Sequence, residues 1–175
     1  MRTNVSESVR PWPARLPLLA GAALLVATLD MALAMGFWSA HGVAPERVLQ
    51  SVASGLAGRA AFAGGVATAV LGLALHLSIA LAMVLAYDAI ALRLPWLVRR
   101  PWLAGPLYGG VLYLVMTGIV LPLSAAPHAT LSIAWLAASV FSHVVLVGLP
   151  CALLVRAAQA PVARGAGPVA APGAS

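Results

Sequence analysis

The sequence contains very little charge. Only 8% of its 175 residues are charged, and all ten basic residues are arginine, because lysine is absent. Soluble domains carry roughly a quarter charged residues, so water is not the main solvent of this chain. A single cysteine, Cys151, also excludes an intrachain disulfide and any metal motif built on paired cysteines.

The pattern of a nucleic-acid-binding protein is missing as well. The net charge is +6, but the arginines lie beside apolar runs and form no basic stripe with interleaved aromatics. This placement fits anionic lipid headgroups, so the expected partner is a lipid bilayer, with no nucleic acid. Glycine-rich phosphate loops, nucleophile elbows and zinc-protease helices are absent too, which argues against an enzyme of a soluble type.

What the sequence has in abundance is apolar residues, at 62% of the chain. A helix needs about 20 residues to cross a bilayer, and it satisfies its own backbone hydrogen bonds there. We therefore predict an all-α membrane protein, an antiparallel bundle of four transmembrane helices. The predicted spans are residues 16–38, 65–87, 103–123 and 131–155 within a transmembrane domain of residues 16–156.

Two tails flank this domain. Residues 1–15 are predicted to be a cytoplasmic N-terminal tail. Residues 157–175 are rich in Ala, Pro and Gly without apolar periodicity, which predicts a disordered cytoplasmic tail. The first span also resembles a signal peptide with a cleavage motif at Ala32-Leu33-Ala34. Asp30 beside that motif argues against cleavage, so we expect the span to be retained.

The distribution of arginine predicts the orientation. The two tails and the loop between the second and third spans hold eight arginines, whereas the other two connections hold only Arg47 and Arg59. Cytoplasmic loops of membrane proteins are enriched in arginine and lysine. Both termini are therefore predicted to lie in the cytoplasm.

A short amphipathic helix is predicted on the opposite side, at residues 45–56. Proline suits its first turn, and Glu46 is favourable at the positive end of the helix dipole. At about 100° per residue the sequence separates an apolar side from a polar side. The apolar side comprises Val48, Leu49, Val52 and Leu56, and the polar side comprises Glu46, Arg47, Gln50, Ser51 and Ser54. Such a helix is expected on the outer membrane surface, or as a lid that folds back.

Three ionisable side chains fall inside predicted spans at similar depth. These are Asp30, His76 and His143, and each follows a stripe of small or hydroxylated residues that permits close helix approach. A carboxylate in hydrocarbon is costly, so Asp30 is expected to face other helices and to be paired or protonated. The prediction is one midplane polar site formed by these three residues.

The chemistry of this site stays open at the level of sequence. It could relay protons or hold a substrate or ion, or it could consist of structural hydrogen bonds between helices. His76 and His143 could also ligate a haem b iron, and together with Asp30 they could bind a divalent metal such as zinc or copper.

Several segments carry a resemblance. They are Leu49-Gln50-Ser51-Val52-Ala53-Ser54-Gly55-Leu56, Gly72-Leu73-Ala74-Leu75-His76, Leu121-Pro122-Leu123-Ser124 and Val147-Gly148-Leu149-Pro150. In these segments the chain resembles a bacterial family of small, uncharacterised four-span inner-membrane proteins, over roughly Gly21 to Arg156. The resemblance implies a bacterial inner-membrane location and the same four-helix plan. It supplies no activity, cofactor or catalytic residue.

The functional hypothesis from sequence is a binding, transport or assembly component of the membrane. The alternatives are a bis-histidine haem b electron-transfer protein and a structural subunit of a larger membrane complex. Homo-oligomers are expected if the protein conducts or transports, because four helices make a small bundle.

Overall fold

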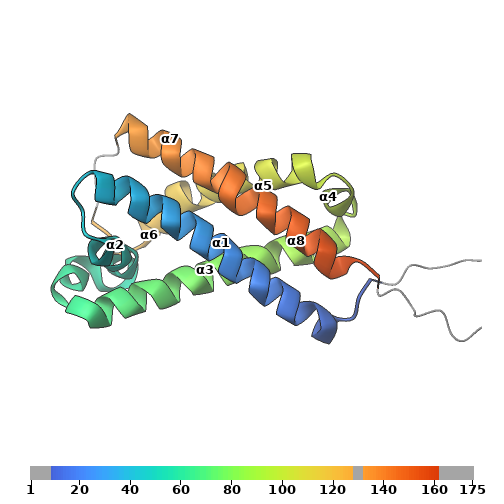
Figure 1. Ribbon diagram of the computed structural model, residues 1–175, viewed down its shortest axis with the longest axis horizontal. Coiled ribbons are helices and arrows are strands. Elements are labelled where there is room, and N and C mark those ends of the chain that lie inside the picture. Colours follow the sequence, from blue (N-terminus) through green and yellow to red (C-terminus); the bar gives the residue numbers. More distant parts are fainter. Residues whose placement is uncertain (1–8, 128–131, 162–175) are drawn as a thin grey trace, which may run out of the picture.

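The computed structural model describes residues 9–127 and 132–161, which form helices and connecting turns without a strand. Four helical stretches are long and apolar enough to cross a membrane, which confirms the predicted all-α membrane bundle. They are Trp12–Ala40, Gly65–Arg93, Pro101–Leu123 and Ile133–Gln159. Successive stretches run in opposite directions, and both ends of the described chain lie at one end of the bundle (Figure 1). We call this the terminal end.

The first two spans are single helices, and the last two are composite. The first span is α1 (Trp12–Ala40) and the second is α3 (Gly65–Arg93). Helix α2 (Pro45–Ala57) and the 3₁₀ segment η1 (Gly58–Ala63) connect them, and α4 (Trp96–Arg99) follows α3. The third span consists of α5 (Pro101–Val115), η2 (Met116–Val120) and α6 (Leu121–Leu123), and the fourth of α7 (Ile133–Phe141), η3 (Ser142–Gly148) and α8 (Leu149–Gln159).

The helices extend further toward the terminal end than the apolar runs predicted. Helix α1 begins at Trp12, within the predicted tail, and α8 continues to Gln159, so residues 157–159 are helical and not part of a disordered tail. Two charged residues that border the apolar runs, Arg15 and Asp88, are themselves buried here, and they pair between helices. Residues 1–8 and 162–175 of the predicted tails lie outside the described residues.

A buried polar cluster explains these longer helices. Arg15 of α1 forms a salt bridge of 3.0 Å with Asp88 of α3. Gln159 of α8 donates hydrogen bonds to a carboxylate oxygen of Asp88 at 2.8 Å and to its backbone carbonyl at 3.1 Å. Three helix ends are therefore fixed to one another at the terminal end.

Glycines set a close helix approach where α5 crosses η3 and α8. A Cβ atom at Gly105 or Gly109 would overlap backbone atoms of the fourth span, at Leu149 and His143 respectively. A Cβ atom at Gly148 would overlap the carbonyl oxygen of Gly105. The spacing of Gly105 and Gly109 therefore places both glycines on the face of α5 that meets the fourth span.

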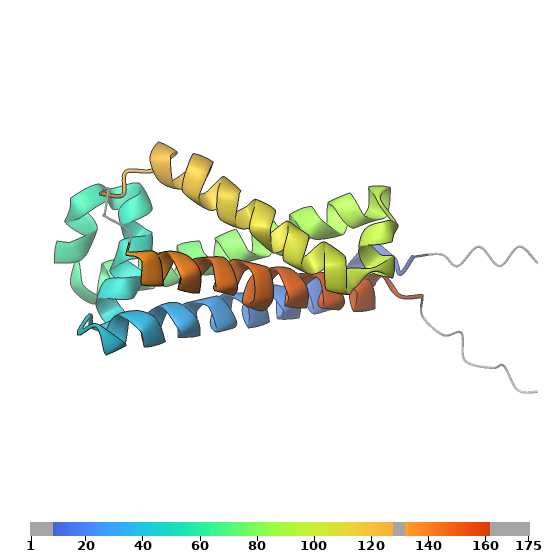
Figure 2. The same ribbon diagram turned by 90° about the horizontal axis from the view of Figure 1, so that it is seen from above.

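The four spans form an open ring. Helix α1 packs against α3 on one side and against the fourth span on the other, and the fourth span packs against α5. Between α3 and α5 the contact is confined to the terminal half, where the Tyr108 hydroxyl donates to the Met83 carbonyl oxygen at 2.7 Å. Beyond this hydrogen bond the two helices diverge toward the other end of the bundle (Figures 1 and 2).

Helix α2 lies across the end of the bundle opposite the terminal end, which we call the α2 end (Figure 1). It rests on α3 at Gly72, where a Cβ atom would overlap the backbone carbonyl of Leu49. On its other side the Gly55 carbonyl accepts a hydrogen bond of 2.9 Å from the Ala125 amide, just after α6. It therefore bridges α3 and the third span where they are furthest apart.

The predicted bounds of this helix are close to the observed ones, but the predicted apolar side is buried only in part, at Val48. Gln50 and Ser54, assigned to the polar outer side, are 3% and 2% exposed, whereas the apolar Leu56 is 68% exposed. The contact with α3 is so close that small residues and backbone form it, and the Gln50 amide donates to the Gly65 carbonyl oxygen at 3.1 Å. Hydrophobicity alone did not reveal this face.

Candidate functional site

A cavity of about 350 Å³ lies inside the open ring, on the α2 side of the Tyr108–Met83 hydrogen bond. All four spans and α2 contribute to its lining, which is mostly apolar. The polar residues in the lining are Asp30, Ser51, His76, Tyr113, Thr117, Ser124, Ser139 and His143. An apolar pocket with a few convergent polar groups is the usual form of a small-molecule site.

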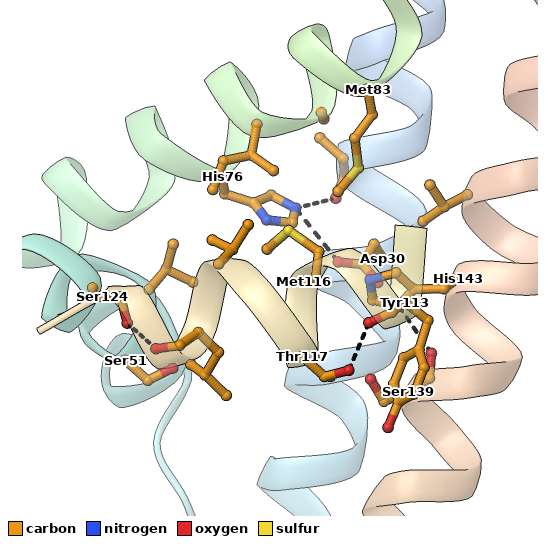
Figure 3. A pocket seen from close by; sticks show the side chains of 18 of the residues that line it. Asp30, Ser51, His76, Met83, Tyr113, Met116, Thr117, Ser124, Ser139 and His143 are labelled. Carbon is orange, nitrogen blue, oxygen red and sulfur yellow. Dashed lines mark hydrogen bonds and ion pairs between the residues drawn. The ribbon is translucent and has the colours of Figure 1, made fainter. Parts of the chain in front are cut away.

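The three residues predicted to share a site all line this cavity (Figure 3). Asp30 comes from α1, His76 from α3 and His143 from η3. Each lies about one helical turn from the middle of its helix, toward the α2 end. The three residues thus lie at a similar height along the bundle, displaced from the middle because the helices extend further at the terminal end.

Asp30 makes the closest polar contacts of the site. The Ser142 hydroxyl donates to Asp30 Oδ1 at 2.5 Å. The second oxygen, Oδ2, lies 4.0 Å from His76 Nε2, beyond hydrogen-bonding distance. The Asp30 side chain is 26% exposed. One carboxylate oxygen is therefore held by the protein, and the other is accessible to a ligand.

The two imidazoles are oriented by backbone carbonyl groups. His76 Nε2 lies 3.0 Å from the Ala27 carbonyl oxygen, and His143 Nδ1 lies 2.9 Å from that of Ser139. A carbonyl oxygen can only accept, so these two nitrogens carry hydrogen. The opposite nitrogen of each neutral ring, Nδ1 of His76 and Nε2 of His143, is then a hydrogen-bond acceptor. His143 also packs edge-on against Tyr113, with ring centroids 5.6 Å apart.

Two segments of π-helix form part of the cavity wall, and each precedes a proline. Segment η2 ends at Val120, two residues before Pro122, and η3 ends at Gly148, two residues before Pro150. Proline cannot donate to the carbonyl four residues earlier, and the helix widens there into the i→i+5 pattern. In η3 this wider turn brings Ser142 to Asp30 while its neighbour His143 lines the cavity. The prolines thus affect the site through the helix register.

The charge of the cavity is unbalanced. Asp30 is the one acidic residue in its lining, and among the described residues no arginine lines it. The nearest buried arginine, Arg15, is paired with Asp88 at the terminal end. The side chains able to offset the Asp30 charge within the cavity are therefore the two histidines.

Metal and haem ligation fit this geometry poorly. Within residues 9–127 and 132–161, no three His, Cys, Asp or Glu side chains come together in a group that could hold a metal ion. For a bis-histidine haem, His76 would have to present its Nδ1, since Nε2 faces the Ala27 carbonyl and Asp30. The arrangement therefore favours neither haem ligation nor metal ligation.

Sequence reasoning missed several residues of the site. Ser142 was not identified, because a single serine in an apolar run gives no signal of its own. Ser132 caps α7 by accepting from the Trp135 amide at 3.1 Å. Met83, Met116 and Val120 also line the cavity, and they gave no signal because apolar residues are common in every span.

Fold and site together define a multi-pass membrane protein with an internal, partly polar cavity. Comparison of the chain with protein-family models, curated proteins and solved structures gives no significant match. The resemblance to small bacterial four-span proteins gains no support from these comparisons and stays a prediction.

Proposed function

We propose that this protein is a membrane-embedded receptor or carrier that binds a small, membrane-soluble molecule in the cavity between α3 and α5. The observation that carries the proposal is the cavity itself: about 350 Å³, mostly apolar, with Asp30, His76 and His143 in its lining. This volume falls in the range of small-molecule sites.

The route of entry favours a ligand dissolved in the bilayer. The α2 end of the cavity is covered by Ser51, Val52 and Gly55 of α2. On the terminal side the core is tightly packed, and Val84, Tyr87 and Cys151 are completely buried. The remaining side is the gap between α3 and the third span, where Ile79 is partly buried and Val120 is exposed. This gap would face lipid.

For the orientation, we propose a bacterial inner membrane with both termini in the cytoplasm. In the structure, six arginines group at the terminal end, at positions 10, 15, 93, 99, 100 and 156, and Arg47 and Arg59 lie near the α2 end. The positive-inside rule then places the terminal end in the cytoplasm and α2 outside. Anionic headgroups are the expected contacts of the exposed arginines at that end.

Filling the cavity tests the proposal. Thr117→Phe places a ring in the cavity, and Thr28→Phe places the same ring on an exposed surface of α1. The two threonines are well matched, because each hydroxyl bonds the carbonyl four residues before it, at 2.7 Å and 2.8 Å. The probe is tert-butylbenzene, added to the protein in lipid nanodiscs, and the readout is tryptophan fluorescence, since Trp135 lines the cavity.

We expect a saturable fluorescence change in the wild type and in Thr28→Phe, and its loss in Thr117→Phe. A Trp135→Phe variant checks that the signal comes from the cavity. Equal responses in the two phenylalanine variants would show that the probe binds elsewhere, and the proposal would then be rejected.

A further inference from the structure

We infer that the ligand is a cation, an amine or quaternary ammonium group on an apolar body, whose positive charge binds Asp30. This inference rests on the proposed function and specifies its ligand class. Three properties of the cavity lead to it: an uncompensated carboxylate, an accessible oxygen on that carboxylate, and aromatic groups in the same cavity lining.

The first property is the missing positive charge. An ionised carboxylate at membrane depth requires a compensating charge, since its cost in hydrocarbon is at least about 2.5 kcal/mol. Elsewhere in the protein this need is met within the chain, because Asp88 is paired with Arg15. Around Asp30 no arginine is present among the described lining residues. The charge must therefore come from a ligand or from a proton, and the two compete.

The groups that surround Asp30 agree with this conclusion. From α3 it faces His76, from η3 it faces Ser142, and His143 and Tyr113 are the other titratable side chains in the lining. Helix α2 contributes Ser51, Val52 and Gly55, and none of these carries charge. A bound cation therefore meets no fixed positive charge in the cavity.

The second property is the accessible oxygen. Ser142 donates to Oδ1, but Oδ2 has no hydrogen-bond partner among the described residues and lies 4.0 Å from His76. An ionised carboxylate has about four acceptor positions, so several remain for a ligand. The carboxylate is fixed in place by Ser142 before a ligand arrives, which lowers the ordering cost of binding.

The third property is the pair of aromatic residues in the lining, Tyr113 and Trp135. Ring faces attract organic cations through their quadrupoles, and quaternary ammonium groups are recognised in this way. The sulfur atoms of Met83 and Met116 add a polarisable, adaptable surface for an apolar body (Figure 3). The lining thus suits a charged head and a hydrophobic remainder in one molecule.

A matched pair of probes separates charge from shape. Phenyltrimethylammonium and tert-butylbenzene have nearly the same shape and differ in the central nitrogen cation and carbon atom. Each is titrated against the wild type, Asp30→Asn and the control Glu46→Gln in identical nanodiscs. Glu46 is an exposed carboxylate of α2 outside the cavity lining. Comparing one probe between variants cancels its partitioning into lipid.

We expect Asp30→Asn to raise the dissociation constant of phenyltrimethylammonium at least about tenfold, in keeping with the loss of a desolvated charge pair. The same variant should change the dissociation constant of tert-butylbenzene by less than about twofold. Glu46→Gln should change the dissociation constant of neither probe. If the neutral probe binds the cavity but the cation binds no more weakly to Asp30→Asn, the inference is wrong and the proposed function stands. If neither probe binds the cavity, both fail.

A second variant covers the case that Asp30→Asn does not fold. Tyr113→Leu removes an aromatic face and keeps the carboxylate. It should raise the dissociation constant of the cation by at least about threefold, as expected for a cation–π contact. The dissociation constant of tert-butylbenzene should rise by less. Equal losses for the two probes would contradict cation recognition.

Discussion

The guanidinium group of Arg15 donates to both carboxylate oxygens of Asp88, at 3.0 Å and 3.1 Å, across 73 residues of sequence. Both side chains are almost completely buried, at 8% and 2% exposed. The pair joins the start of α1 to the end of α3, and Gln159 attaches the end of α8 to the same carboxylate. One charge pair thus fixes three helix ends.

Removing one partner of this pair should be strongly destabilising. Asp88→Leu leaves the Arg15 charge buried alone, and we expect a loss of about 3–5 kcal/mol in the free energy of unfolding. The double variant Arg15→Met with Asp88→Leu should regain a large part of that loss, because no charge is left unpaired. Unfolding in mixed micelles at increasing denaturing detergent measures all three proteins. A double variant no better than Asp88→Leu alone would contradict this account.

Two adjacent glycines of α5 should respond oppositely to alanine. A Cβ atom at Gly109 would overlap the His143 carbonyl, whereas Gly110 has no atom within 4 Å of such a Cβ. Gly109→Ala should therefore separate α5 from η3 and cost about 1–3 kcal/mol as an overpacked contact. Gly110→Ala should be neutral or stabilising by up to about 1 kcal/mol, because alanine favours the helix. Similar unfolding curves for the two variants would refute the tight crossing.

The hydrogen bond between Ser142 and Asp30 should contribute to stability. Ser142→Ala leaves a carboxylate oxygen without its donor, and we expect a cost of about 1–3 kcal/mol. Ser78→Ala is the matched control, since the Ser78 hydroxyl is exposed and bonds only the Ala74 carbonyl of its own helix, at 2.8 Å. The control should change the unfolding free energy by about 0.5 kcal/mol or less. Equal effects of the two substitutions would mean that the hydrogen bond between Ser142 and Asp30 does not stabilise the protein.

Cysteine labelling tests the orientation without replacing the native cysteine. Cys151 is completely buried, so the unaltered chain should not react with a membrane-impermeant maleimide. Arg59→Cys near the α2 end should react in intact cells, and Arg99→Cys should react only after the cells are opened, because the arginine bias places the terminal end inside. Reaction of the second variant in intact cells would reverse the proposed topology.

The sequence predicted the spans well because their determinants are local. An apolar run of sufficient length forms a helix in lipid whatever its neighbours are. The predicted ends of the spans were less accurate, since they left Arg15, Asp88 and Gln159 just outside the transmembrane helices. Their burial depends on one another across the sequence, and no local pattern contains that information.

The site was predictable in its residues but not in its contacts. Asp30, His76 and His143 stand out because ionisable residues are rare in apolar runs. The partner of Asp30 is Ser142, and its contact with Asp30 depends on how η3 packs against α1, which no local pattern contains. Likewise, the buried face of α2 follows from Gly72 of α3, and hydrophobicity within α2 indicates a different face.

The gap between α3 and α5 determines what a ligand must displace. Ile79 and Val120 line the cavity from its two sides, and they would meet acyl chains at this gap. A vacant cavity would then be occupied by a lipid tail, and binding would be an exchange of one apolar occupant for another. Lipid tails are as apolar as leucine, so burial of the ligand body contributes little net free energy. Occupancy would then depend on the mole fraction of ligand in the bilayer, and a change in acyl-chain composition would alter it without any change in the protein.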